Sequence, residues 1–387
     1  MTGVCKKYRY EHAYISKRSL RAAVCLKGSV MEKKKVRIVL DAMGGDFAPH
    51  CAVEGAVLAC RDYPVEITLV GNREAIMPHL RRLNATSGVP IILHHTTQVI
   101  DMGDNPLEVV RKKKNSSIRA GLELVLANKG DAFVSAGNSG AVASGSIFVL
   151  KRISGIDRPA IAAVLPTLAG QVVVADTGAN SVVKPFHLVQ FAIMASAYST
   201  LYLNCKKPRV GLLSNGSEDS KGTDIIREAH KLLKNSSLNY VGYIEGRDVF
   251  RSAADVVVCD GFTGNIVLKV AEGVAESVAT GLKQEAKKDI LSMIGALLSK
   301  KSFLRVRQRF DYEEYGGAPL LGVNAPVILA HGRSNSHAIK NAVKAAMDYT
   351  LSNVVSHIQH DLEINRDLQS IGKKPSFIKR MLQIARD

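Results

Sequence analysis

The sequence has no tryptophan, few aromatic residues and no cysteine pair. Aromatic side chains make up 5% of the 387 residues, and we find no zinc-finger spacing, aromatic RNP-type strand or recognition helix, so we expect no nucleic-acid partner. The cysteines form no CxxC motif, and the histidines form no HExxH motif or Cys/His cluster. These absences predict a protein with no metal site and no cofactor.

Long apolar runs are missing as well. No uninterrupted run reaches the roughly 18 residues that a spanning helix needs. No segment has the succession of charged, apolar and small residues that is typical of a signal peptide. We therefore expect a cytoplasmic protein with reduced cysteines, and not an integral membrane protein.

Positive charge, in contrast, is abundant. The chain has 52 Lys and Arg against 35 Asp and Glu, a formal net charge of +17. Part of this charge lies in residues 1–30, which lack sustained periodicity and are predicted to be a basic N-terminal extension. This extension is either the result of a translation start upstream of Met31 or a basic tail. Residues 31–387 are predicted to form a single α/β domain with a helical protrusion at about 280–311.

From Val36 onward, short β-rich runs alternate with longer helical stretches. Strands are predicted at residues 36–40, 66–70, 91–94, 132–135, 172–175, 209–213, 240–244, 255–259 and 327–329. This alternation predicts a three-layer α/β/α sandwich with a largely parallel sheet. Ligands of such sheets bind beyond the carboxyl ends of the strands, so we expect the loops that follow these strands to share one rim. We find no internal repeat in the sequence.

Five loops after predicted strands are rich in Gly, Asp, Asn and hydroxyl residues. They are DAMGGD (41–46), SAGNSG (135–140), DTGAN (176–180), SNGSEDSKG (214–222) and DGFTGN (260–265). Glycine allows close approach of the backbone, and the N–H groups at a helix start can hold an anion. Any one loop could be an ordinary strand-to-helix turn, but five on one rim favour an anion site. GxGxxG in a dinucleotide context and GxxxxGK[ST] are both absent, which argues against NAD and P-loop nucleotides.

These loops, together with RKKKNSS (111–117), IEGRD (244–248) and YGGAPLLGV (315–323), resemble the PlsX family of phosphate acyltransferases over about residues 36–347. The resemblance implies a homodimer whose fold is similar to isocitrate and isopropylmalate dehydrogenases and to phosphotransacetylases. It also implies transfer of a fatty acyl group from acyl carrier protein to inorganic phosphate, which gives acyl phosphate for phospholipid synthesis. Phe47 stands where many members have His, which argues against a general base at that position.

Direct attack of phosphate on a thioester requires positioning and charge stabilisation more than a protein nucleophile. The predicted catalytic residues are Asn138 and Asn180 as amide donors, and Lys184 and Lys221 as ligands of phosphate or the oxyanion. His187 or His331 could donate a proton, although a structural role is the alternative for each. The predicted substrate-binding residues, among which Asp46 and Asp260 would organise the loops, are Asp41, Gly44, Gly45, Asp46, Gly137, Ser139, Gly178, Asp260, Gly261, Thr263, Gly264 and Asn265.

Two basic segments suggest partners. The first, Arg111, Lys112, Lys113 and Lys114, would suit an acidic acyl carrier protein, or it is a solvated helix end. The second, residues 289–310, has the composition of a basic amphipathic hairpin. It would either touch an anionic membrane near a membrane acyltransferase, or pack at the dimer interface. Its predicted membrane-contacting residues are Ile290, Leu291, Ile294, Leu297 and Leu298.

Two other functions fit parts of this pattern. A phosphotransacetylase-like enzyme that uses acyl-coenzyme A would share the fold and the chemistry. A non-catalytic basic module that binds membranes or nucleic acid would explain the charge but would leave the glycine-rich loops without a role.

Overall fold

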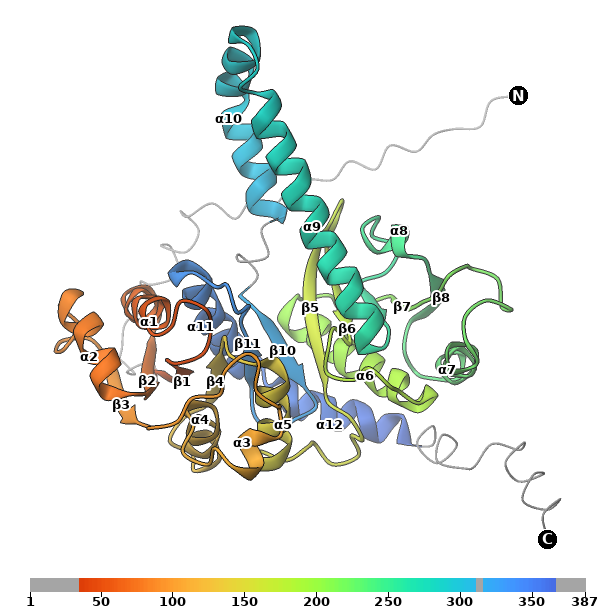
Figure 1. Ribbon diagram of the computed structural model, residues 1–387. Coiled ribbons are helices and arrows are strands. Elements are labelled where there is room, and N and C mark those ends of the chain that lie inside the picture. Colours follow the sequence, from red (N-terminus) through yellow and green to blue (C-terminus); the bar gives the residue numbers. More distant parts are fainter. Residues whose placement is uncertain (1–34, 311–315, 367–387) are drawn as a thin grey trace, which may run out of the picture. The chain divides into compact units, whose positions relative to one another are not determined.

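The computed structural model describes residues 35–310 and 316–366, and the strands in this part of the chain join into one eleven-stranded sheet (Figure 1). Most strands are rich in Val and Ile, which suit a buried pleated surface. The strands are β1 (Val36–Asp41), β2 (Val65–Gly71), β3 (Ile91–His95), β4 (Ala132–Ser135), β5 (Ala160–Thr167), β6 (Gly170–Ala175), β7 (Val210–Leu213), β8 (Tyr240–Ile244), β9 (Val256–Val258), β10 (Ala318–Leu321) and β11 (Val327–Leu329).

The strand order is β3-β2-β1-β4-β11-β10-β5-β6-β9-β7-β8. Neighbouring strands are antiparallel at three consecutive pairs in the middle, β11-β10, β10-β5 and β5-β6. The other pairs are parallel. The prediction of a largely parallel sheet is therefore confirmed. Because three is an odd number of reversals, β1 to β4 and β11 run in the direction opposite to β6 to β9.

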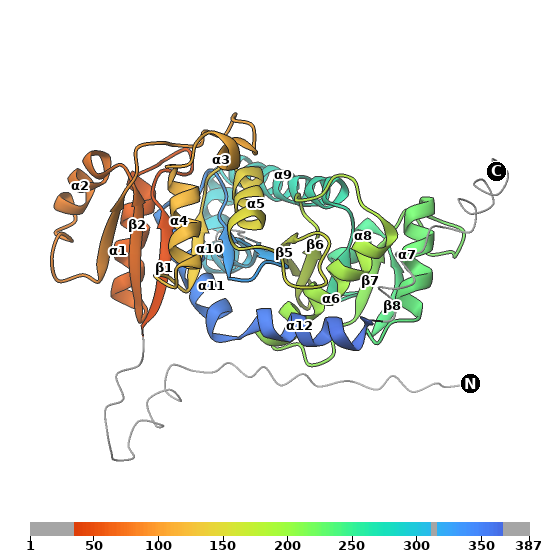
Figure 2. The same cartoon turned by 90° about the horizontal axis from the view of Figure 1, so that it is seen from below.

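Helices cover both faces of the sheet, which confirms the three-layer sandwich. One core cluster unites the sheet with α1, α6, α11 and α12, whereas α4 and α5 pack on the other face, and Figure 2 shows these two groups on opposite sides. The helices are α1 (His50–Asp62), α2 (Arg73–Arg82), α3 (Glu108–Arg111), α4 (Ser117–Leu126), α5 (Ser139–Val149), α6 (Pro185–Tyr202), α7 (Asp224–Lys234), α8 (Gly246–Val249), α9 (Gly261–Glu285), α10 (Ile290–Phe310), α11 (Ser336–Leu351) and α12 (Val354–Ile364).

Two strands were missing from the sequence prediction, β5 and β10. Both contain a proline, β5 is rich in alanine, and β10 is only four residues long, so neither has the Val/Ile pattern of the other strands. They are two of the strands that form the antiparallel pairs. Their omission is therefore the reason that the reversal of direction was not foreseen.

The two halves of the sheet share one arrangement, although the sequence shows no repeat. The first half contains β1-α1-β2 and β4-α5, and the second contains β7-α7-β8 and β9-α9 in the same spatial order. An arginine ties the two central strands of each half at their starts. The Arg37 guanidinium binds the Asp131 carboxylate at 2.6 Å, and the Arg209 guanidinium binds that of Asp255 at 2.9 Å.

Helices α9 and α10 form a hairpin that extends away from the sheet (Figure 1). The hairpin starts earlier than the protrusion expected at about 280, because α9 is a single helix from Gly261 to Glu285. The described residues from Lys35 onward belong to one compact unit. The predicted extension at residues 1–30 lies outside the described residues.

Candidate active site

The glycine-rich loops form two groups, one on each side of the central strands β10 and β5. Ala175, at the end of β6, pairs with Ala162 near the start of β5, whereas Leu329, at the end of β11, pairs with Ala318 at the start of β10. The carboxyl ends of β1, β4 and β11 therefore point in one direction, and those of β6, β9 and β7 in the other. Because Leu320 pairs with Ile161, the two sets of ends lie at nearly the same level of the sheet. The five loops thus do not follow strands of one direction, as the prediction of a single rim required, and the three antiparallel pairs are the reason.

We call residues 41–46, 135–140 and 330–335 the β1/β4 cluster. Its centre is Asp41, which is 1% exposed. The Ser135 hydroxyl donates to Asp41 Oδ2 at 2.7 Å, and the Met43 N–H donates to Oδ1 at 3.0 Å. Burial raises the pKa of Asp41. This carboxyl group organises the loops and is not open to a substrate.

The predicted glycines of this cluster allow its loops to approach one another. A Cβ on Gly44 would lie 2.6 Å from Asp41 Oδ2 and from the Gly137 nitrogen. Gly45 has a φ of +99°, and the next residue, Asp46, donates its N–H to the Gly332 carbonyl at 2.8 Å. Ser139 is exposed at the first position of α5. Substitution at Gly44 would therefore separate the β1 and β4 loops.

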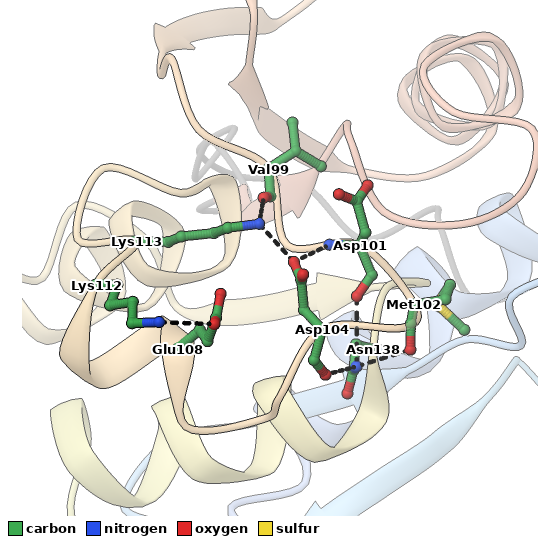
Figure 3. Close-up of polar contacts among 8 residues, drawn as sticks. All are labelled: Val99, Asp101, Met102, Asp104, Glu108, Lys112, Lys113 and Asn138. Carbon is green, nitrogen blue, oxygen red and sulfur yellow. Dashed lines mark hydrogen bonds and ion pairs between the residues drawn. The ribbon is translucent and has the colours of Figure 1, made fainter.

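Asn138, a predicted amide donor, is buried at the start of α5. Its Oδ1 accepts from the Ala141 N–H at 3.0 Å, and its Nδ2 faces the carbonyls of Asp101, Met102 and Asp104 (Figure 3). These bonds use both amide hydrogens. In this arrangement Asn138 positions the backbone and has no N–H left for a substrate.

We call residues 176–184, 214–222 and 260–265 the β6/β9 cluster. Its centre is Asp176, which is fully buried and accepts five hydrogen bonds. The N–H groups of Ile161, Gly178 and Ala179 donate to Oδ1, and both the N–H and the Nδ2 of Asn180 donate to Oδ2. Burial raises the pKa of Asp176 and these donors lower it. Because all five groups can only donate, the geometry fits the carboxylate form.

Asn180, the second predicted amide donor, is buried like Asn138. Its Nδ2 donates to the Pro159 carbonyl at 2.7 Å and to Asp176 at 2.8 Å. The structure therefore gives both asparagines a positioning task. Asp176 is not among the predicted site residues, although an aspartate at a strand end followed by TGAN is a signal for such a carboxylate.

Asp260 caps the long helix α9. Its carboxylate accepts from the Thr263 N–H at 2.9 Å and from the Thr263 hydroxyl at 2.7 Å. Gly261 and Gly264 pack against the Asp176 loop, where a Cβ on Gly261 would lie 2.8 Å from Asp176 Oδ2, while Asn265 is exposed. The start of α9 therefore lies beside the same buried carboxylate.

Three exposed cations lie in or next to the β6/β9 cluster. Lys184 precedes α6, Lys221 lies in the loop after β7, and Arg158 lies just before β5. Within residues 35–310 and 316–366, none of the three forms an ion pair with a carboxylate. His187 Nδ1 accepts from the Lys184 N–H at 3.1 Å, and burial lowers the pKa of this imidazole. The β6/β9 cluster therefore offers uncompensated positive charge to an anion.

The β1/β4 cluster contains the exposed Arg333, which forms no ion pair with a carboxylate of the described residues, whereas the cation beside the cluster is paired. The Lys269 ammonium binds Glu272 at 2.8 Å and lies 3.2 Å from His331 Nε2. Burial, and then the nearby Lys269 charge, lower the pKa of His331. His331 is therefore neutral at pH 7, and the positive charge of Lys269 is largely offset by Glu272.

The predicted partner run does not act as a unit. Lys113 turns inward to Asp104 at 2.5 Å, and Lys112 binds Glu108 at 3.3 Å (Figure 3). Arg111 and Lys114 are exposed.

The predicted membrane-contacting side chains on α10 are also exposed, at 77% for Ile290, 83% for Leu291, 52% for Ile294, 71% for Leu297 and 80% for Leu298. None of the helices in residues 35–310 and 316–366 combines the length and the hydropathy needed to cross a membrane. The same residues contain no group of three or more His, Cys, Asp or Glu side chains that could hold a metal ion.

The chain is similar to known proteins over most of its length. The sequence model of a family described as "Fatty acid synthesis protein" matches residues 36–357. A phosphate acyltransferase of Pelobacter propionicus is 51% identical over 347 residues, which cover 87% of this chain and all of the relative. The phosphate acyltransferase of Geotalea daltonii is 50% identical over 333 residues, 86% of this chain and 96% of the relative.

Solved structures share the fold at low sequence identity. A phosphotransacetylase from Streptococcus pyogenes has a TM-score of 0.55 at 18% identity, over 82% of this chain and 95% of its own. The EutD phosphotransacetylase from Staphylococcus aureus has a TM-score of 0.52 at 18% identity, over 82% and 94%. The matched length and the identity to the relatives show that the chain belongs to the fatty acid synthesis protein family, which is the PlsX family that its loop motifs resemble.

Proposed function

We propose that this protein is an acyl carrier protein-dependent phosphate acyltransferase of phospholipid synthesis. It transfers a fatty acyl group to inorganic phosphate and so makes acyl phosphate. The single observation that supports this best is the 50% identity to phosphate acyltransferases over nearly their whole length. The second observation is the pair of loop clusters built around buried carboxylates.

The reaction requires no protein nucleophile. A phosphate oxygen attacks the thioester carbonyl carbon, an oxyanion forms, and the C–S bond breaks as the thiolate takes up a proton. The protein's part is to hold phosphate, to stabilise the oxyanion and to exclude water. We place phosphate at the β6/β9 cluster, because three exposed cations in or next to it, Lys184, Lys221 and Arg158, have no carboxylate partner within the described residues, whereas the β1/β4 cluster has one such cation, Arg333.

The acyl donor in this proposal is acyl carrier protein. Such carriers are acidic, and the exposed Arg111 and Lys114 supply the complementary charge that speeds an encounter. Acyl-coenzyme A is the alternative donor. Nothing in the two loop clusters favours a coenzyme A nucleotide over a carrier, and a comparison of rates separates the two.

A homodimer is part of the same proposal. Helix α9 carries apolar side chains at every fourth position that are about half exposed: Ile266, Val270, Val274, Val278 and Leu282. An apolar stripe of this length on one helix is typical of a protein interface. A second copy of this chain is the occupant that the family resemblance implies.

Helix α10 is proposed to touch an anionic membrane. Its exposed apolar side chains lie near exposed Lys300, Lys301 and Arg305, a combination that suits the interface between headgroups and acyl chains. We place the protein in the cytoplasm, with peripheral contact to the membrane. There a membrane acyltransferase would take up the labile acyl phosphate.

The test is an assay with purified protein, inorganic phosphate and either long-chain acyl carrier protein or acyl-coenzyme A. We expect acyl phosphate and free carrier to appear in equal amounts, without added metal or nicotinamide, and a higher kcat/KM with the carrier. A higher kcat/KM with acyl-coenzyme A would favour the alternative donor. Folded protein that forms no acyl phosphate from either donor would overturn the proposed activity.

A further inference from the structure

The chain between β3 and α3 forms a strap at residues 99–106 that is fixed by Lys113. The Lys113 ammonium donates to Asp104 Oδ2 at 2.5 Å and to the Val99 carbonyl at 2.8 Å (Figure 3). The same carboxylate oxygen accepts from the Asp101 N–H at 2.8 Å. Both charged side chains are about one-quarter exposed. One lysine therefore joins the first residue of the strap to its middle.

Asn138 fixes the other side of the strap. Its Nδ2 lies 3.0 Å from the Met102 carbonyl and 3.1 Å from that of Asp104, while its Oδ1 caps α5. The strap is thus attached to the start of the helix that follows β4. A segment without secondary structure of its own is held in one conformation by two side chains from different elements.

The strap lies against the β1/β4 cluster. A Cβ on Gly140 would lie 2.7 Å from Pro106 Cγ, and one on Gly332 would lie 3.1 Å from Met102 Cε. Glycine at these two positions permits the close approach. Met102 itself remains 52% exposed, so the strap presents a flexible apolar side chain between the start of α5 and the loop after β11. Such a side chain adapts to apolar groups of different shape.

We propose that Lys113 is a positioning residue for the acyl donor: it holds the strap so that Met102 contacts the apolar part of the thioester. This inference rests on the proposed acyl transfer. The inference also gives the residues of the basic run 111–114 different roles. Lys113 acts inward on the strap, whereas Arg111 and Lys114 face solvent and meet the carrier. The bond to Asp104 also raises the pKa of Lys113, so the ammonium stays charged.

The experiment compares two donors, acyl carrier protein and the corresponding acyl-pantetheine thioester, which lacks the protein surface. We expect Lys113→Met to raise the KM for both donors by roughly tenfold, since a displaced substrate-positioning segment has effects of this order or larger. The KM for phosphate should stay unchanged, and Lys113→Arg should restore most of the loss. Lys112→Met is the matched control, because Lys112 binds only Glu108, four residues earlier in the chain. This variant should leave the KM for acyl-pantetheine unchanged.

Hydrogen exchange provides a second measurement that does not depend on turnover. The Asp101 amide should exchange faster in Lys113→Met and at the wild-type rate in Lys112→Met. If Lys113→Met does not fold, Asp104→Asn removes the same ion pair from the strap side and should give the same change in both KM values. A loss confined to the carrier donor would show that Lys113 is a docking residue and would overturn the inference, as would an unchanged KM for both donors. Wild-type protein that makes no acyl phosphate would instead refute the proposed function.

Discussion

The two halves of the sheet are built in the same way but differ in the groups that surround their central aspartates. In each half a buried aspartate follows a strand and gathers the surrounding loops. Asp41 is met by the hydroxyls of Ser135 and Ser117 and by backbone N–H groups, whereas Asp176 is met by five N–H groups. A hydroxyl can reverse its hydrogen bond and an N–H cannot. The halves also differ in their cations: Lys184, Lys221 and Arg158 near Asp176 have no carboxylate partner in the described residues, whereas near Asp41 the unpaired Arg333 lies beside the paired Lys269.

The largest expected effect separates the two aspartates. In Asp176→Asn the new amide group must face backbone N–H donors, so we expect a loss of about 3 kcal/mol in the free energy of unfolding. In Asp41→Asn the Ser135 hydroxyl can turn to accept from the amide, and the loss should be about 1 kcal/mol. Urea unfolding of both variants measures the difference. Equal losses would show that the kind of donor does not matter.

The second prediction tests the placement of phosphate. Lys184→Ala and Lys221→Ala should each lower kcat/KM for phosphate by roughly tenfold or more, because each removes a charged ligand. The matched change beside the β1/β4 cluster, Lys269→Ala, should leave the KM for phosphate unchanged. Steady-state kinetics at varied phosphate concentration measure all three variants. A phosphate effect only in Lys269→Ala would place the anion at the β1/β4 cluster.

The third prediction concerns the helices that occupy equivalent positions in the two halves. Helix α5 ends at Val149, whereas α9 continues to Glu285 and turns into α10. We expect binding to anionic liposomes that falls several-fold when Ile294→Glu and Leu298→Glu are combined, and that also weakens with salt. Flotation or sedimentation with vesicles measures it, and the oligomeric state of the variant serves as the control. Wild-type protein that ignores anionic vesicles at low salt would refute a membrane role for α10.

The smallest effect concerns the arginine ties at the strand starts. Burial alone would raise the pKa of Asp255, but the bonds from Arg209 outweigh burial and hold this pKa below its usual value. A carboxylate with a lowered pKa stabilises the fold above its unfolded pKa of about 3.9, and this contribution disappears as pH falls through the folded value. Asp255→Asn should therefore cost about 1 kcal/mol at pH 7, since the pair is partly exposed, and this cost should shrink as pH falls through the folded pKa of Asp255.

Urea unfolding of wild-type protein and Asp255→Asn at several pH values measures this dependence. Asp131→Asn, which breaks the corresponding tie to Arg37, should behave in the same way if the halves are equivalent in this respect. A cost of Asp255→Asn that is as large at low pH as at pH 7 would show that the ion pair is not its cause.

The fold class could be predicted from the sequence, because Val- and Ile-rich runs between helical stretches mark buried parallel strands. The direction of each half could not. It depends on β5 and β10, whose prolines and alanines hide them, and on pairings between residues that are far apart in the chain. The loops of the candidate site were therefore found, but the opposite directions of the two groups of strands that they follow were not.

Individual side chains were harder to predict than loops. Asn138 and Asn180 look like available donors in the sequence, yet burial commits their amides to carbonyls and to Asp176. The run at residues 111–114 gives no sign that Lys113 differs from its neighbours. Its direction is set by Asp104, which lies nine residues earlier, and by the carbonyl of Val99.

The strand pair β10-β11 also determines the order in which the protein can be completed. During synthesis β4 emerges roughly 190 residues before β11, its neighbour in the sheet, a delay of about 10 to 40 s at ordinary translation rates. Until then the nascent chain holds two separate sheets, β3-β2-β1-β4 and β5-β6-β9-β7-β8, each with an unpaired edge at its inner strand. Such edges can pair with other chains. A chain that stops after α9 would therefore carry two open edges, and a ribosome that pauses there would hold the protein in its most aggregation-prone form.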